Sequence, residues 1–250
     1  MKILIVNDDG YTSIGIRNLA KELSKSHEVT VIAPLKCNSG MAHAMTFGKP
    51  IYLKKISNPN ENYDCYSVSG TPADCVKLGT ELMVPNPPDL IISGINNEPN
   101  IGTTIVYSGT ANAAMEATIL GYKAIAVSGN PTCDEDFDYI INYFIEHLDY
   151  YLSLCSVEYA LNVNINNEKI GNIAHKLTPI GVRIFSDIYL VGEGDENGIP
   201  HKLVGNPLPI ANVEDCDVTW YHKGYATITP LTSDNTMFTA LKILKRKVNE

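Results

Sequence analysis

Short apolar runs alternate with helical patterns through the first 165 residues, and this alternation constrains the fold more than any other feature of the sequence. Strands are predicted at 2–6, 28–33, 50–55, 63–68, 87–96, 123–129 and 158–165. Helices are predicted at 16–23, after a Thr71-Pro72 start, at 108–121 and at 137–152. Strands separated by helices are typical of a mostly parallel sheet covered on both faces. We therefore predict an α/β fold, Rossmann-like, with three α/β/α layers in a single domain over 1–250.

The helical rhythm stops in the last third of the chain. Residues 176–228 contain short β-prone pieces between Gly, Asn and Pro, as in GEGDENGIP at 192–200. We predict an α/β core over 1–175, followed by a β-rich extension over 176–228 that makes oligomer contacts. Residues 233–247 predict a C-terminal helix, because Lys and Arg in its final turns suit the helix dipole.

Charge and cysteine usage exclude several classes of protein. The net charge is −9, from 28 acidic and 19 basic residues, which disfavours binding to a nucleic-acid polymer. Six cysteines without C-x-x-C spacing favour reduced thiols over a disulfide framework or a zinc site. No apolar run approaches the roughly 20 residues of a membrane span, and the first acidic pair comes too early for a signal peptide. We expect a cytoplasmic protein that does not bind membranes.

Polar side chains follow three of the predicted strands. Asp8 and Asp9 come after the first strand, Ser39 and Gly40 follow the second, and Asn96 ends the strand at 87–96. In an open α/β sheet the carboxyl ends of the strands form the binding edge. Carboxylate, hydroxyl and amide oxygens suit Mg²⁺, Mn²⁺ or Ca²⁺. Taken alone, the Asp8-Asp9 pair is explained equally well by a metal site and by a simple turn before a helix. Without a cation, however, one of two adjacent carboxylates would have a raised pKa.

Three nucleotide- and phosphate-handling classes lack their motifs here. The glycine-rich G-x-G-x-x-G loop of nicotinamide enzymes is absent, and so is the P-loop of nucleoside triphosphatases. A phosphatase with a nucleophilic aspartate needs D-x-D, whereas this chain has Asn7 and Asp9 at that spacing.

The stretch YSGTANAAMEA at 107–117 predicts a place for an anion. Ser108, Gly109 and Thr110 open a helix, where backbone N–H groups can bind phosphate. An ordinary helix cap explains the same residues. A cation site and a phosphate site at one sheet edge together suggest metal-assisted phosphoester hydrolysis.

Seven motifs occur in a fixed order along the chain: NDDG at 7–10, APLKCNSG at 33–40, GTPADCV at 70–76, PDLIISGIN at 88–96, N-x-G at 100–102, YSGT-x-x-AAME at 107–116 and ITPLTSD at 228–234. In this order they resemble the motifs of the SurE (survival protein E) family of metal-dependent 5'/3'-nucleotidases. The resemblance implies hydrolysis of nucleoside 5'- and 3'-monophosphates or other small phosphoesters, and of short polyphosphate. It also implies one Mg²⁺ or Mn²⁺ per subunit, bound by Asp8, Asp9, Ser39 and Asn96, in a homodimer or homotetramer.

Several positions depart from the family pattern. Glu98 stands where a glycine is usual, Thr104 replaces an Asp, and Ala111 replaces a Val. Glu98 brings extra negative charge near the predicted site, and it would be strained if the family glycine has a positive φ.

Our mechanistic hypothesis assigns each remaining residue a role. Asp8 or Asp9 orients or deprotonates the attacking water. The phosphate and substrate are bound by Asn7, Gly40, His43, Asn100, Ser108, Gly109 and Thr110. His43 is either the acid that protonates the leaving group or a packing residue. A non-catalytic nucleotide- or phosphate-binding protein is the alternative, and a nucleotide-sugar transferase is a third possibility without motif support.

Overall fold

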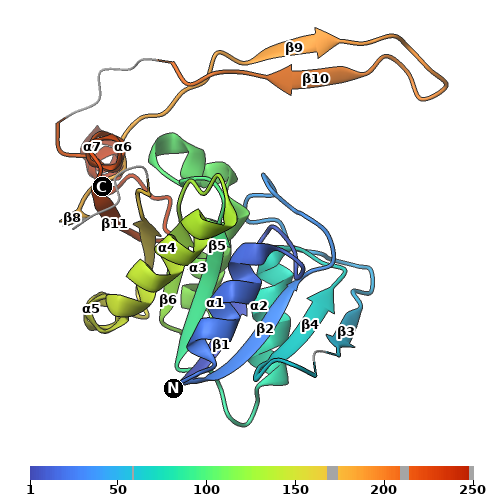
Figure 1. Cartoon of the computed structure of the whole chain (residues 1–250). Coiled ribbons are helices and arrows are strands. Elements are labelled where there is room, and N and C mark those ends of the chain that lie inside the picture. Colours follow the sequence, from blue (N-terminus) through green and yellow to red (C-terminus); the bar gives the residue numbers. More distant parts are fainter. Residues whose placement is uncertain (58, 168–173, 209–213, 248–250) are drawn as a thin grey trace.

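The centre of the structure, a computed structural model, is one large twisted sheet with helices on both faces (Figure 1). The structure describes residues 1–57, 59–167, 174–208 and 214–247. Within these ranges the sheet has nine strands in the order β3-β4-β2-β1-β5-β6-β7-β11-β8. The run from β4 to β7 is parallel, whereas β3 and β11 lie antiparallel to their inner neighbours. The predicted mostly parallel α/β fold is therefore confirmed.

The described part of the chain forms a central sheet, a separate two-stranded hairpin and a set of helices. The central strands are β1 (Lys2–Val6), β2 (Glu28–Pro34), β3 (Leu53–Ile56), β4 (Asp64–Val68), β5 (Leu90–Asn96), β6 (Ala124–Ser128), β7 (Ala160–Asn164), β8 (His175–Leu177) and β11 (Ala226–Leu231). A separate hairpin consists of β9 (Ile188–Val191) and β10 (His201–Val204). The helices are α1 (Ile14–Leu23), α2 (Pro72–Leu82), the short 3-10 helix η1 (Gly102–Tyr107), α3 (Gly109–Ile119), α4 (Asp134–Glu146), α5 (Leu148–Leu154), α6 (Asp217–His222) and α7 (Phe238–Lys247).

Both faces of the sheet are buried, as its nearly continuous apolar strands require. In β1, Ile3 and Ile5 pack on one face with α1, α4 and α5, whereas Leu4 and Val6 pack on the other with α2 and α3. The second face is lined by small residues such as Ala113 of α3, so this helix lies close to the strands. The tight packing fixes the position of the first turn of α3 at the binding edge of the sheet.

Local sequence signals set several element boundaries. Thr71 caps α2 in a capping box with Asp74, as the Thr71-Pro72 pattern predicts. The predicted helix over 137–152 is instead two helices that meet at His147. At this point the Tyr143 carbonyl accepts the His147 N–H at 3.2 Å and also lies 2.9 Å from Nδ1 of the His147 ring, so backbone and side chain share one acceptor.

Only part of the segment predicted as a β-rich extension, residues 176–228, lies outside the central sheet. The hairpin β9–β10 projects away from the rest of the molecule (Figure 1). In contrast, β8 and β11 join the central sheet, and α6 is a short helix inside the range predicted to be β-rich. Helix α7 begins at Phe238 rather than at 233. Within the described ranges, no helix combines the length and apolar character needed to cross a membrane.

Candidate active site

A cavity of about 410 Å³ opens at the carboxyl ends of β1 and β5. Its walls include Asp8, Ser39, Gly40, Asn96, Glu98, Asn100, Tyr107, Ser108, Arg183 and Phe185. Three of the four predicted metal ligands thus line one cavity, although they lie up to 88 positions apart in the sequence. Asp9, the fourth, lines a neighbouring cavity of about 420 Å³ with Ser13 and Cys37.

The buried side chain of Asn7 shapes the turn that carries the two carboxylates. Its amide Nδ2 donates to the Gly10 carbonyl at 3.0 Å and to Ser13 Oγ at 2.9 Å, and its Oδ1 accepts from the Gly10 N–H at 3.2 Å. Gly10 has a φ of +100°, which a side chain would strain. The structure therefore places Asn7 in the turn itself, where its polar atoms are already bonded.

Asp8 is buried against the first turn of α3. Thr110 Oγ1 donates to Asp8 Oδ1 at 2.5 Å, and the backbone N–H groups of Gly109 and Thr110 also favour the ionised carboxylate. Burial outweighs these bonds and raises the pKa of Asp8. A Cβ at Gly109 would stand 2.8 Å from Asp8, so only glycine allows this approach. Ser108 caps the helix by accepting from the Ala111 N–H at 3.0 Å.

Asp9 is the more strongly perturbed carboxylate. Burial, the Asp8 carboxylate and Glu98, in that order, raise the pKa of Asp9 to about 7. The backbone of Glu98 is tied to the site, because Asn96 Nδ2 donates to the Glu98 carbonyl at 2.6 Å. Among described non-glycine residues only Ala42 has a positive φ, so the strain anticipated at Glu98 is absent.

The segment after β2 brings Ser39 and Gly40 to Asp8. The Asn38 N–H donates to the Asp8 carbonyl at 2.7 Å, which joins this segment to the turn after β1. Ser39 Oγ lies 3.0 Å from Cys37 Sγ, and Gly40 has a φ of +76°. The backbone around Gly40 therefore needs glycine at the wall of the cavity.

Asn100 is held in place by the neighbouring strands. Its N–H donates to Asn164 Oδ1 at 2.7 Å, and its carbonyl accepts from Asn162 Nδ2 at 2.8 Å. Its side-chain Nδ2 donates one hydrogen to Ser128 Oγ at 2.9 Å, which leaves the second hydrogen for another acceptor. The network orients Asn100 toward the cavity that it lines.

His43 is the one predicted substrate-binding residue that the structure places at another cavity. Its Nε2 lies 2.8 Å from the buried carboxylate of Glu116, which Lys77 also contacts. His43 lines a cavity beside Met115 and Leu231. The described geometry is that of a link between the segment after β2 and helix α3.

The cavity at Asp8 is also lined by Arg183, Phe185 and Tyr107, which were not among the site residues predicted from the sequence. Arg183 is the only Lys or Arg among the described residues that line it, and its guanidinium lies 5.1 Å from the Phe185 ring centre. The Arg183 N–H donates to Thr103 Oγ1 at 3.2 Å, and Thr103 Oγ1 donates back to the Arg183 carbonyl. Tyr107, exposed at the end of η1, completes this wall. No motif surrounds Arg183 in the sequence, so only the three-dimensional structure reveals it.

The donors present fit a hard divalent cation. Asp8 and Asp9 have raised pKa values, as expected of carboxylates that would gain from a nearby positive charge. The Asn96 side-chain oxygen accepts no hydrogen bond from the described residues, because Nδ2 makes the bond to Glu98. No group of three His, Cys, Asp or Glu that could hold a metal occurs in the described ranges. A cation here would thus depend on the mixed set of carboxylate, hydroxyl and amide oxygens.

Comparisons with known proteins identify relatives over the whole chain. Residues 3–187 match the family model described as "Survival protein SurE". The chain is 39% identical to the 5'-nucleotidase SurE of Thermoanaerobacter sp. (strain X514), covering 98% of this chain and 97% of that protein. It is 40% identical to the 5'-nucleotidase SurE of Clostridium beijerinckii, over 96% of each chain. The crystal structure of the SurE protein from Aquifex aeolicus matches with a TM-score of 0.81 at 34% identity, covering 98% of this chain and 99% of that one.

Proposed function

Because this chain belongs to the SurE family, we propose that it is a phosphohydrolase that releases phosphate from nucleoside 5'-monophosphates. The observation that carries the proposal is the meeting of Asp8, Ser39 and Asn96 in one cavity beside Asp9. We extend the proposal to nucleoside 3'-monophosphates and short polyphosphate, since the open cavity edge does not select one type of ester by shape.

We further propose one divalent cation per subunit, Mg²⁺ or Mn²⁺, with Asp8, Asp9, Ser39 and Asn96 as its ligands. When bound, such a cation lowers the pKa of a coordinated water and neutralises charge that develops on the phosphoryl oxygens. The raised pKa values of the two carboxylates support this assignment, because a cation favours their ionised forms.

The chain's own residues have three tasks in this proposal. Asp8 or Asp9 orients or deprotonates the attacking water, and Thr110 positions Asp8 through its 2.5 Å hydrogen bond. The backbone at Gly40 and the free N–H of Asn100 bind phosphoryl oxygens. Ser108 keeps the end of α3 aligned, since its side chain caps that helix.

Recognition of the rest of the nucleotide falls to the far wall of the cavity. Arg183 supplies positive charge in the cavity that Asp8 and Glu98 also line, which suits a phosphate ester in an otherwise acidic site. Phe185 and Tyr107 offer aromatic surface for the nucleoside. Both the charge and the aromatic surface are provided by side chains that line the same cavity as Asp8.

Oligomer contacts and location complete the proposal. The hairpin β9–β10 exposes Tyr189 and Val191, and α7 exposes Phe238 and Leu244, without any contact that buries them. Exposed apolar surfaces of this kind favour association, which supports a homodimer or homotetramer. Free thiols at all six cysteines support a reducing compartment, the cytoplasm.

The test is phosphate release from a panel of 5'- and 3'-nucleoside monophosphates and short polyphosphate. Each reaction is run after chelation and again with Mg²⁺ or Mn²⁺ restored. We expect metal-restored release that Asp8→Asn abolishes, whereas Asp64→Asn, at an exposed ion pair with Lys55, retains it. A folded protein that binds nucleotide but releases no phosphate with either metal would contradict the proposal and favour the non-catalytic alternative.

A further inference from the structure

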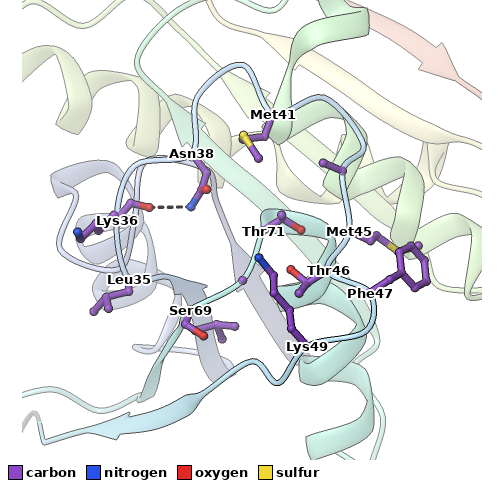
Figure 2. A pocket seen from close by; sticks show the side chains of 13 residues that line it. Leu35, Lys36, Asn38, Met41, Met45, Thr46, Phe47, Lys49, Ser69 and Thr71 are labelled. Atoms are coloured by element: carbon purple, nitrogen blue, oxygen red, sulfur yellow. Dashed lines mark hydrogen bonds between the residues drawn. The ribbon is translucent and has the colours of Figure 1, made fainter. Parts of the chain in front are cut away.

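A second, larger cavity is lined by Asn38, Met41, Lys49 and Thr71 (Figure 2). Its volume is about 710 Å³, compared with about 410 Å³ for the cavity at Asp8. Asn38 and Met41 line the larger cavity, whereas Ser39 and Gly40 between them line the smaller one. Two cavities therefore share one short backbone segment as a wall.

One positive charge is directed into the larger cavity. Figure 2 shows the Lys49 side chain extending into it from below, with its amino group toward Thr71. Within the described ranges the Lys49 amino group makes no hydrogen bond or ion pair, and no Asp or Glu lines the cavity. The other lysine at this cavity, Lys36, turns its amino group away (Figure 2). In a chain with a net charge of −9, this cavity is suited to an anion.

The remaining lining suits an organic group beside the anion. Met41, Val68 and Leu35 give apolar surface, and the hydroxyl of Thr71 and the amide of Asn38 are uncharged. A cavity with mostly apolar walls, few polar groups and one cation is typical of a small-molecule site. A phosphate ester of a small organic molecule has both parts, a dianion and an apolar body.

The wall of this cavity is fixed in position. Asp74 of α2 accepts from the Thr46 N–H at 3.1 Å and from Thr46 Oγ1 at 2.6 Å. His43 is linked to Glu116 of α3, and the other end of the segment is joined to Asp8 through Asn38. A cavity held at both ends does not have to form when its ligand arrives, which lowers the entropic cost of binding.

We propose that this cavity is a second ligand site, which binds a phosphate monoester of a small organic molecule with its phosphate at Lys49. The site is separate from the cavity at Asp8 and does not depend on the activity proposed for it.

Binding to metal-free protein tests the proposal. With the cation chelated, the carboxylates of Asp8 and Glu98 disfavour phosphate at the first cavity, and the loss of binding in a Lys49 variant, measured by calorimetry, assigns the remaining nucleotide binding to the second cavity. We expect adenosine 5'-monophosphate to bind, and Lys49→Met to weaken that binding at least about tenfold. The matched control Lys36→Met removes a lysine at the same cavity whose amino group points away, and it should change the affinity by less than about twofold.

Adenosine and inorganic phosphate identify which part of the ligand is recognised. Adenosine should bind more weakly than its monophosphate because it lacks the anion, and inorganic phosphate should bind more weakly because it lacks the organic group. No binding to the chelated protein, an equal loss in Lys36→Met, or an affinity for adenosine or inorganic phosphate equal to that for the monophosphate would overturn the proposal. Phosphate release by Lys49→Met with metal restored is measured on the same preparations, so failure of the proposed hydrolysis is seen separately.

Discussion

Replacing Asp9 with Asn should stabilise the metal-free protein while removing its activity. The carboxyl of Asp9 is largely buried beside Asp8 and Glu98, and its pKa in the folded protein is raised to about 7. Ionising Asp9 therefore costs free energy in the fold unless a cation is present. Asparagine keeps the shape of the side chain and removes the charge.

The size of the effect follows from the two protonation equilibria. The ordinary pKa of an Asp side chain is 3.8, and we take this pKa for Asp9 in the unfolded chain. In the folded protein the pKa of Asp9 is about 7. Between these values the folded protein holds a proton that the unfolded chain has lost, so the free energy of unfolding falls as pH rises and levels off above about 7. A shift of about three units corresponds to about 4 kcal/mol at most, and solvent screening at the partly exposed carboxyl reduces this to about 2 kcal/mol.

Urea unfolding in chelator at pH 5 and pH 8 measures this difference. We expect the wild type to lose stability between the two pH values by about 1–2 kcal/mol more than Asp9→Asn does. Glu98→Gln should give a smaller change in the same direction, because Glu98 is the smallest of the three causes. Added Mn²⁺ should stabilise the wild type at pH 8 and stabilise Asp9→Asn much less. Equal pH dependence in the wild type and Asp9→Asn would refute the reasoning.

Three further changes test individual contacts. Gly109→Ala should lower phosphate release by about 10²-fold or more with little loss of stability, since the new Cβ would stand 2.8 Å from Asp8; near-normal release would contradict this placement. His43→Gln should reduce release by less than about fivefold, because glutamine can still donate to Glu116, whereas loss of a general acid would cost 10²–10⁴-fold. Asp217→Ala should lower the free energy of unfolding, measured in urea, by about 3 kcal/mol, because three backbone N–H groups that donate to the Asp217 carboxylate would lose their acceptor. A loss of less than about 1 kcal/mol would contradict this expectation.

The α/β core and the meeting of Asp8 with Ser39 and Asn96 could be predicted because both depend on local information. The continuous apolar run of β1 and the Thr71-Pro72 start of α2 are visible in short windows of sequence. The carboxyl ends of parallel strands lie at one edge whatever the details of packing. Three residues placed at strand ends were thus expected to meet without knowledge of the strand order.

The residues that were missed depend on long-range contacts. Arg183 reaches the cavity because its backbone pairs with Thr103, which lies 80 positions earlier. The pairing of β11 with β7 likewise joins distant segments, so the return of the chain to the central sheet after the hairpin could not be inferred from local patterns. The break at His147 coincides with a side-chain contact to the Tyr143 carbonyl, which a periodic apolar pattern does not show.

The first turn of α3 illustrates how a correct local pattern can have a different purpose. Its N–H groups and the Thr110 hydroxyl were expected to bind phosphate, and in the structure they support the Asp8 carboxylate. A helix N-terminus lowers the cost of one buried negative charge, and here that charge belongs to the protein. In the function that we propose, other groups bind the substrate phosphate, namely Gly40, Asn100 and Arg183, together with the cation proposed at Asp8. In the proposed mechanism the helix therefore positions Asp8 and offsets part of the cost of burying its charge, and the close approach of the two residues explains why glycine is needed at position 109.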